Sequence, residues 1–234
     1  MNKKRNMRNI LATLVFCAVW SIAGKKGLVV KKENISFDEI VLPKTIDDSK
    51  TSLEKILRNR RSVRNYKNKA LTLQQLAQLL WAAQGITNKQ GLRTAPSAGA
   101  LYPIEIYVVV GNVENIAAGI YRYNCKKHTI IPIKPGDKRS ELASASLGQS
   151  CVGEGAIDIV ITGIFERTSR KYGARAQRYV YMEAGHVAQN IYLQAAALGL
   201  DTVSVGAFDD ENVKKVICAQ ANEQPLYVMP IGQK

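Results

Sequence analysis

Histidine and cysteine are scarce in this chain of 234 residues, which contains two histidines and four cysteines. No Cys-x-x-Cys motif and no cluster of cysteine and histidine occurs, so the ligand spacing of a zinc site or a redox dithiol is missing. We therefore expect no metal centre. The three cysteines beyond the N-terminal region, Cys125, Cys151 and Cys218, are expected to be small core residues.

Long apolar runs and glycine-rich nucleotide motifs are also missing. The apolar run at residues 10–20 is shorter than the roughly 20 residues that a membrane-spanning helix needs. No Gly-x-Gly-x-x-Gly motif follows an expected strand, so we expect no separate nicotinamide-binding domain. A hydrophobic content of 46% with 22% charged residues is typical of a globular protein, and the length suits one sizeable core.

Acidic residues are few, because 19 Asp and Glu face 33 Lys and Arg, which gives a formal net charge of +14. Such an excess is found in proteins that bind nucleic acid. Aromatic residues make up only 7% of the chain, and no interleaved aromatic platform or recognition motif accompanies the basic residues. We therefore expect no nucleic-acid partner.

The first 24 residues have the parts of a secretory signal. Four basic residues precede the apolar run, and small residues follow it at positions 21–24. We predict that residues 1–24 are a signal peptide, which exports the protein, or an uncleaved membrane anchor, and that residues 25–50 are a linker or arm. An inward-facing anchor would keep the domain cytoplasmic, so both locations stay open.

Helical and strand patterns interleave beyond residue 50 without strict alternation. Thr51 with Glu54, and Thr72 with Gln75, have the spacing of capping boxes that open two helices. The longest helical pattern runs from about residue 174 to 198. Strand patterns occur at residues 104–110, 119–123, 129–133, 157–164, 202–207 and 226–231. This order predicts an α+β fold with a mixed, mostly antiparallel central sheet flanked by helices.

Two short segments carry the chemistry. Residues 60–64 place three arginines and a serine within five positions, and arginine pairs bidentately with phosphate or carboxylate. Residues 94–103 read Thr-Ala-Pro-Ser-Ala-Gly-Ala-Leu-Tyr-Pro, and the glycine permits close approach of the backbone to a flat ring. The alternatives are a solvated basic face for the first segment and a plain turn for the second.

Together these segments resemble the nitroreductase family of FMN enzymes. Residues 60–66 match its R-R-S-x-R-x-[FY] pattern, and residues 94–103 match the T-x-P-S-x-G-x-L-Y-P pattern of one branch. That branch includes the dehydrogenases that oxidise thiazoline and oxazoline rings in modified peptides. Residues 119–128 and 181–190 match two further elements of the branch, and the likeness covers roughly residues 51–232.

The resemblance implies an FMN site at a homodimer interface, formed by residues 51–234. It implies contacts of Arg60, Ser62 and Arg64 with the phosphate and ribityl chain, of Arg61 with the pyrimidine edge, of Pro96, Ser97, Ala98 and Gly99 with the flavin of the partner subunit, and of Ser204, Val205 and Gly206 with the flavin face or N5. Lys171 and Tyr172 match a pair that abstracts a proton in the ring-oxidising enzymes, although an exposed basic turn is the alternative. Glu183 and His186 are expected to be structural.

These implications predict an FMN-dependent oxidoreductase. It would pass two electrons from NAD(P)H or another donor, through flavin N5, to a nitroaromatic, a quinone or a similar small-molecule acceptor. One alternative is a dehydrogenase that oxidises a peptide azoline ring or another small molecule with oxygen as acceptor. The other is a non-catalytic module that binds flavin or nucleic acid. Contact with a membrane is expected only through the N-terminal segment, if it is not cleaved.

Overall fold

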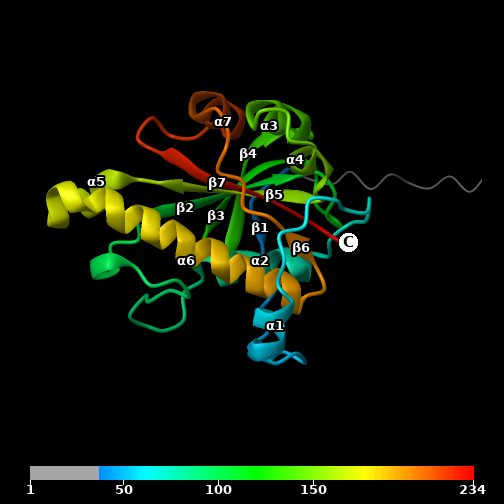
Figure 1. Ribbon diagram of the computed structural model, residues 1–234, viewed down its shortest axis with the longest axis horizontal. Helices are drawn as coiled ribbons and strands as arrows, with labels where there is room; N and C mark the ends of the chain where they lie inside the picture. The colour runs from blue at the N-terminus through cyan, green and yellow to red at the C-terminus, as the bar shows by residue number, and fades with distance from the viewer. Residues whose placement is uncertain (1–36) are drawn as a thin grey trace, which may run out of the picture. The chain divides into compact units, whose positions relative to one another are not determined.

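A computed structural model describes residues 37–234, in which an antiparallel sheet separates two layers of helices (Figure 1). The sheet has the order β1-β4-β3-β2-β5-β7-β6. Its strands are β1 (Ile40–Val41), β2 (Ile104–Val110), β3 (Gly119–Asn124), β4 (Thr129–Pro135), β5 (Ile157–Gly163), β6 (Asp201–Thr202) and β7 (Gln224–Gly232). The α+β prediction with a mostly antiparallel sheet is confirmed. The predicted signal or anchor at residues 1–24 lies outside the described residues.

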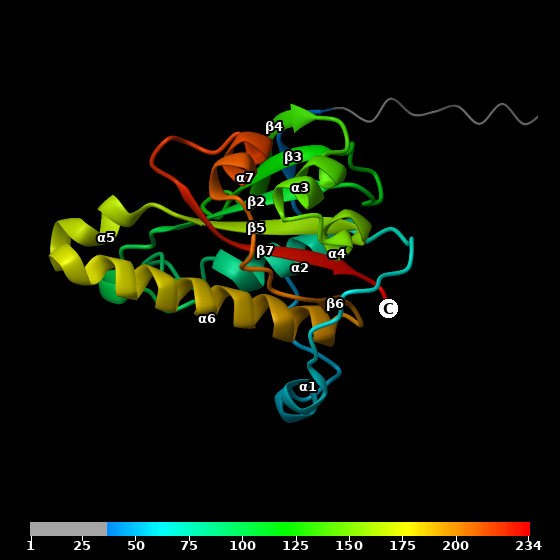
Figure 2. The ribbon, with the colours of Figure 1, turned by 45° about the horizontal axis from the view of Figure 1, so that its top comes forward.

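The helices pack on both faces of this sheet (Figure 2). They are α1 (Leu53–Asn59), α2 (Leu73–Gln84), α3 (Arg139–Ala145), α4 (Ser150–Glu154), α5 (Phe165–Tyr172), α6 (Ala176–Ala197) and α7 (Asp210–Ile217), with two short 3₁₀ turns, η1 (Ala98–Ala100) and η2 (Gly173–Arg175). The first core lies between the sheet and helices α2 and α6, and the second lies between the sheet and helices α3, α4 and α7.

Strand β2 shows how the sequence builds both cores. Successive side chains of a strand point to opposite faces, so Ile106 and Val108 join the core under α6 while Tyr107 and Val109 join the core under α3. All four are at most 2% exposed. Burial of one such side chain contributes about 1.5–3 kcal/mol, which explains why the central strands are apolar on both faces.

The two predicted capping boxes have different outcomes. Thr72 caps α2 as predicted: its hydroxyl accepts from the Gln75 backbone N at 3.1 Å, and the Gln75 side chain accepts from the Thr72 backbone N at 2.9 Å. The prediction at Thr51 is wrong, because Ser52 is the cap of α1 and accepts from the Lys55 backbone N. The helix begins one residue later than expected, so Glu54 cannot complete the box.

Two further expectations need correction. The strand predicted at residues 202–207 pairs with β7 only through Asp201–Thr202, and then only Val205 returns to bridge Val228. The chain leaves the sheet between them because the Ser204 backbone N bonds to a side chain of α6 instead. Cys218 is exposed in a left-handed conformation after α7, so its assignment to the core is wrong.

The segment that precedes α1 contributes to the sheet where it is described. Ile40 and Val41 form the edge strand β1 and pair with Ile130 and Thr129 of β4. The His128 ring lies between the two segments, with Nε2 3.1 Å from the Pro43 carbonyl oxygen. Within residues 37–234, no helix combines the length and the apolar character needed to cross a bilayer.

Replacement of the α2 cap tests this account. We expect Thr72→Ala to lower the free energy of unfolding by about 1 kcal/mol, because it leaves a backbone N–H of the first turn without its acceptor. Thr51→Ala is the matched control and is expected to change stability by less than about 0.5 kcal/mol. Urea denaturation of both variants measures the difference. An equal loss in the two would contradict the assignment of the caps.

Candidate functional site

The arginine-rich segment leaves α1 in an extended conformation and lies beside β6. Ser62 forms a parallel bridge with Thr202, and the Val63 backbone N donates to the Thr202 carbonyl at 3.0 Å. This pairing brings residues 60–64 next to Ser204, which lies 140 positions or more further along the chain. Two of the predicted cofactor-binding segments therefore meet in the fold.

Tyr192 of α6 holds these segments together. Its hydroxyl lies 3.0 Å from Ser62 Oγ and accepts a hydrogen bond from the Ser204 backbone N at 2.8 Å. The guanidinium of Arg60 lies over the Tyr192 ring, with Cζ 5.0 Å from the ring centre. We call Arg60, Ser62, Tyr192 and Ser204 the arginine cluster. Tyr192 has no signal in the sequence apart from its position on a helical pattern.

Three other residues predicted to contact the cofactor in this region, Arg61, Arg64 and Val205, lie outside the arginine cluster. Arg61 Nη1 donates to the carbonyl oxygens of Arg58 and Arg60, so its side chain folds back on its own segment. Arg64 is exposed and lies near Cys151, where its charge opposes the rise in thiol pKa that burial causes. Val205 is buried in its bridge to β7.

The second predicted segment is a tight loop with an unusual backbone. Gly99, Ala100 and Tyr102 all have positive φ, of 63°, 53° and 49°. The left-handed region is unfavourable for residues with a Cβ, so the loop needs support. The Tyr102 backbone N donates to Ser97 Oγ at 2.9 Å, and His186 Nδ1 of α6 lies 3.4 Å from the Pro96 carbonyl oxygen, to which it donates.

Lys171 and Tyr172 converge on this loop from the end of α5. A Cβ added to Gly99 would lie 2.9 Å from the Tyr172 hydroxyl and 3.0 Å from Lys171 Nζ. Glycine therefore suits position 99, because a side chain there would be strained at φ 63° and would displace the ends of the Lys171 and Tyr172 side chains. The structure thus brings together the predicted loop and the predicted catalytic pair.

Glu183 of α6 also contacts this loop, through Ser97. Its side chain is 2% exposed, and the Ser97 hydroxyl donates to its carboxyl group. Burial raises the pKa of Glu183 to about 7, although the Ser97 hydrogen bond and the charge of Arg93 oppose the rise. Its Oε1 atom has no hydrogen-bond partner among the described residues. We call residues 96–99, Lys171, Tyr172, Glu183 and His186 the loop cluster.

The two clusters lie on different stretches of α6. Glu183 and Tyr192 are nine residues apart, which corresponds to about 14 Å along a helix. The remaining predicted contact, Gly206, is exposed, and a Cβ there would meet only the Tyr227 ring, at 3.7 Å. Among residues 37–234 no group of three or more histidine, cysteine or acidic side chains could hold a metal ion.

Comparison with known proteins identifies the family of the chain. Residues 57–233 match the family model of the nitroreductase family. A protein of Methanocaldococcus jannaschii, provisionally named a nitroreductase, is 46% identical over 196 residues, which cover 84% of this chain and 96% of that protein.

Two further relatives are informative. The crystal structure of a protein of Ralstonia eutropha, also provisionally named a nitroreductase, has a TM-score of 0.75 at 29% identity and covers 86% of this chain and 91% of that chain. The microcin B17-processing protein McbC of Escherichia coli is 34% identical over 146 residues, which cover 60% of this chain and 54% of McbC. The chain thus spans about half the length of McbC.

The pKa of Glu183 gives a testable pH dependence. Since this pKa is raised in the folded state, the folded protein keeps a proton that the unfolded chain has lost, and stability falls as pH rises from about 4.5 to about 7. Glu183→Gln cannot titrate but still accepts from Ser97. We expect the melting temperature of the variant, relative to that of the wild type, to be higher at about pH 8 than at about pH 5. Thermal scans at both values measure this, and a difference independent of pH would contradict the assignment.

Proposed function

Because the chain belongs to the nitroreductase family, we propose that it is an FMN-dependent oxidoreductase. It would pass two electrons from NAD(P)H or another donor to a nitroaromatic, a quinone or a similar acceptor. The observation that carries this proposal is the arginine cluster with the adjoining Arg61 and Arg64, where arginines without a carboxylate partner among the described residues lie beside an open backbone segment. Three steps of evidence support it.

The first step is the charge of residues 60–64. The ion pairs within residues 37–234 involve neither Arg60 nor Arg61 nor Arg64. Arg64 and Ser62 are exposed, and Arg60 is half-buried. Concentrated guanidinium charge without a counter-ion suits a phosphate group, which accepts several charge-assisted hydrogen bonds. The residues therefore fit the phosphate end of FMN.

The second step is the open surface beside the cluster. Ser204 is fixed by Tyr192, and Gly206 presents backbone with no side chain of its own. A flat ring can approach such a backbone closely. The N–H groups of Ser204 and Val205 are bonded to Tyr192 and Val228, so that of Gly206 is the candidate donor to the ring. When FMN is bound there, it supplies the two-electron chemistry, while these residues orient it and cover one of its faces.

The third step concerns the loop cluster. It lies about 14 Å from the arginine cluster along α6, so we propose that a complete site combines the arginine cluster of one protomer with the loop of a second copy in a homodimer. In this arrangement the loop would exclude water from the ring. Exclusion of water strengthens the electrostatic interactions that favour a reduced, negatively charged cofactor.

The visible absorption spectrum of the purified full chain tests the proposal. We expect the absorption of oxidised flavin, before or after reconstitution with FMN, and its loss on anaerobic addition of NADPH. If another donor bleaches the flavin and NADPH does not, the assignment of FMN stands and the assignment of NADPH as donor is wrong. A colourless protein that retains no added FMN would overturn the proposal and favour a module without flavin.

A pair of arginine variants tests the phosphate contact. We expect Arg60→Met to weaken the affinity for FMN by about tenfold or more, because it removes a charge-assisted donor. Arg58→Met removes an exposed charge from the last turn of α1 and is the matched control, with an expected change below about twofold. Fluorescence titration of FMN measures both. Equal effects would mean that only the general positive field matters.

A second candidate function is the oxidation of a peptide azoline ring. The observation that favours it is the convergence of Lys171 Nζ and the Tyr172 hydroxyl on Gly99, together with the similarity to McbC. The oxidation removes a proton and a hydride from the ring: Lys171 would take the proton from a ring carbon, the hydride would go to bound FMN and its two electrons on to oxygen, and Tyr172 would orient the amine or the ring. The general acid–base role requires both groups within reach of the substrate, and their shared position beside Gly99 supports this assignment.

Variants of this pair distinguish the two candidates. For the azoline reaction we expect Lys171→Met to lower the rate with a thiazoline peptide by about a hundredfold, as for loss of a general base, without slowing reduction of the flavin by NADPH. Arg170→Met removes a neighbouring exposed charge and serves as the control. Single-turnover kinetics with each reductant measure the effect. If Lys171→Met oxidises the thiazoline peptide at the wild-type rate, the pair is structural.

A further inference from the structure

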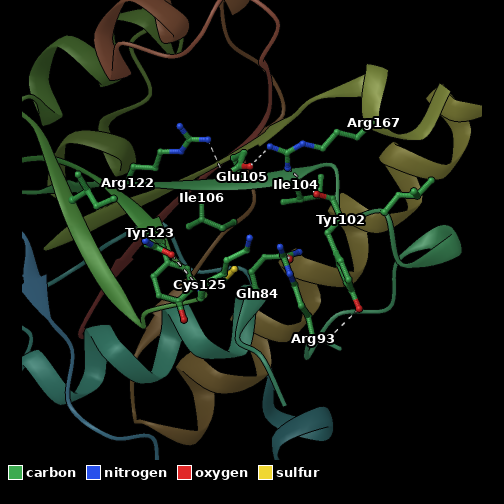
Figure 3. A pocket seen from close by; sticks show the side chains of 14 residues that line it. Gln84, Arg93, Tyr102, Ile104, Glu105, Ile106, Arg122, Tyr123, Cys125 and Arg167 are labelled. Atoms are coloured by element: carbon green, nitrogen blue, oxygen red, sulfur yellow. Dashed lines mark hydrogen bonds and ion pairs between the residues drawn. The ribbon is translucent and has the colours of Figure 1, made fainter. Parts of the chain in front are cut away.

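A cavity of about 480 Å³ lies beside the loop cluster and has no role in the function proposed above. It is lined by the first residues of β2, the end of β3, the last residue of α2 and one side chain of α5 (Figure 3). Arginines 93, 122 and 167 all line it. The question is which of these charges are available to a ligand.

Two of the guanidiniums are already neutralised. Arg122 and Arg167 pair with the two oxygens of Glu105, at 3.0 Å and 2.6 Å, and Arg122 also lies 3.4 Å from the fully buried Glu223. Arg167 Nη1 further donates to the Tyr102 carbonyl oxygen at 2.9 Å. These contacts build a rigid wall of nearly balanced charge, since two cations face two carboxylates.

Arg93 is different. Its Cζ lies 4.3 Å from the centre of the Tyr102 ring, and its only side-chain hydrogen bond among the described residues is from Nη1 to Gln84 Oε1, at 2.6 Å. Gln84 is neutral, so Arg93 has no ion-pair partner within residues 37–234. The nearby Glu183 compensates incompletely, because its pKa of about 7 leaves it partly protonated at neutral pH.

Gln84 adds a second donor at the same point. It is 2% exposed, and its Nε2 group is buried without an acceptor in the described part of the chain. A buried N–H group without a partner is unfavourable, so an acceptor supplied by a ligand would be stabilising. The side chains of Gln84 and Arg93 meet at the cavity (Figure 3). A small shift of both would let one planar carboxylate accept from each of them.

The rest of the lining is mostly apolar. The Tyr102 ring, Leu101, Ile104, Ile106 and Ile131 face the cavity. Apart from the exposed Lys126 at the rim, the cavity offers one available guanidinium and one amide. These match a single negative charge, whereas the carboxylate of Glu105 in the wall disfavours a second one. A ligand with a carboxylate at one end and an apolar or aromatic body therefore matches the cavity in both charge and polarity.

We propose that this cavity binds a carboxylate carried on an apolar or aromatic body, through Arg93 and Gln84. The site goes beyond the function proposed above. Its position would make it an anchor for a substrate, since Arg167 on its wall precedes Lys171 by one turn of α5 and Tyr102 belongs to the loop held by Ser97. Binding itself does not depend on the flavin.

Calorimetric titration of the full chain with phenylacetate and with its neutral analogue phenylacetamide tests the site. We expect phenylacetate to bind at least about tenfold more tightly, because only the carboxylate forms charge-assisted bonds. Arg93→Met and Gln84→Glu should each abolish this preference; the second variant is nearly isosteric and places its own carboxylate against Arg93. Lys126→Met, which removes an exposed charge from the rim, should preserve it.

Two results would overturn the site. One is a wild-type protein without preference for phenylacetate, and the other is a preference that survives Gln84→Glu or is lost equally in Lys126→Met. Should Arg93→Met fail to fold, the result with Gln84→Glu decides whether the site exists. This variant keeps the size of the side chain, so it preserves the packing while its carboxylate occupies Arg93. The titrations use protein with and without FMN, so loss of the carboxylate preference with the flavin spectrum intact refutes this site alone.

Discussion

The packing of α6 on the central sheet is the constraint on which the rest of the site depends. Val180, Val187 and Ile191 lie on its inner face and are fully buried against the first core. With that face fixed, the helix has no freedom to rotate, so the side chains at its flanks have set positions. Glu183 and His186 reach the loop at residues 96–99, and Tyr192 reaches the arginine segment. One helix thereby positions both clusters.

The arginines of the structure fall into two groups, those paired with carboxylates and those without such a partner. Arg122 and Arg167 are satisfied by Glu105 and Glu223 and stiffen the wall between β2 and α5. The arginines of residues 60–64 have no such partners among the described residues, and their charge is free to attract an anion. A pair held in partly buried surroundings is costly to break, whereas an exposed arginine can exchange water for a ligand.

Local signals in the sequence predicted the parts of the fold that depend on neighbours in the chain. The Thr72 capping box, strands β2 and β5 and most of α6 follow from spacing alone. Helix α5 was missed because only Thr168 of its eight residues is buried, so it shows no apolar stripe. Tyr192, Glu183 and Arg93 were missed as site residues because their roles arise from tertiary contacts. The family resemblance predicted the loop at residues 96–99 and the arginine segment as site residues. The spacing of residues could not predict the side chains that hold these two segments in place.

The loop beyond Ser97 shows why those tertiary contacts are needed. Ala100 and Tyr102 adopt positive φ, which is unfavourable by roughly 1–2 kcal/mol for each residue with a Cβ, so the loop would relax if it stood alone. Ser97 and Arg167 hold the backbone N and O of Tyr102 respectively, while Glu183 holds Ser97. Strain maintained in this way is characteristic of functional sites. The same loop contacts Arg93 through the Tyr102 ring and contacts Lys171 and Tyr172 through Gly99, so the contacts that hold the loop also fix the positions of these side chains relative to one another.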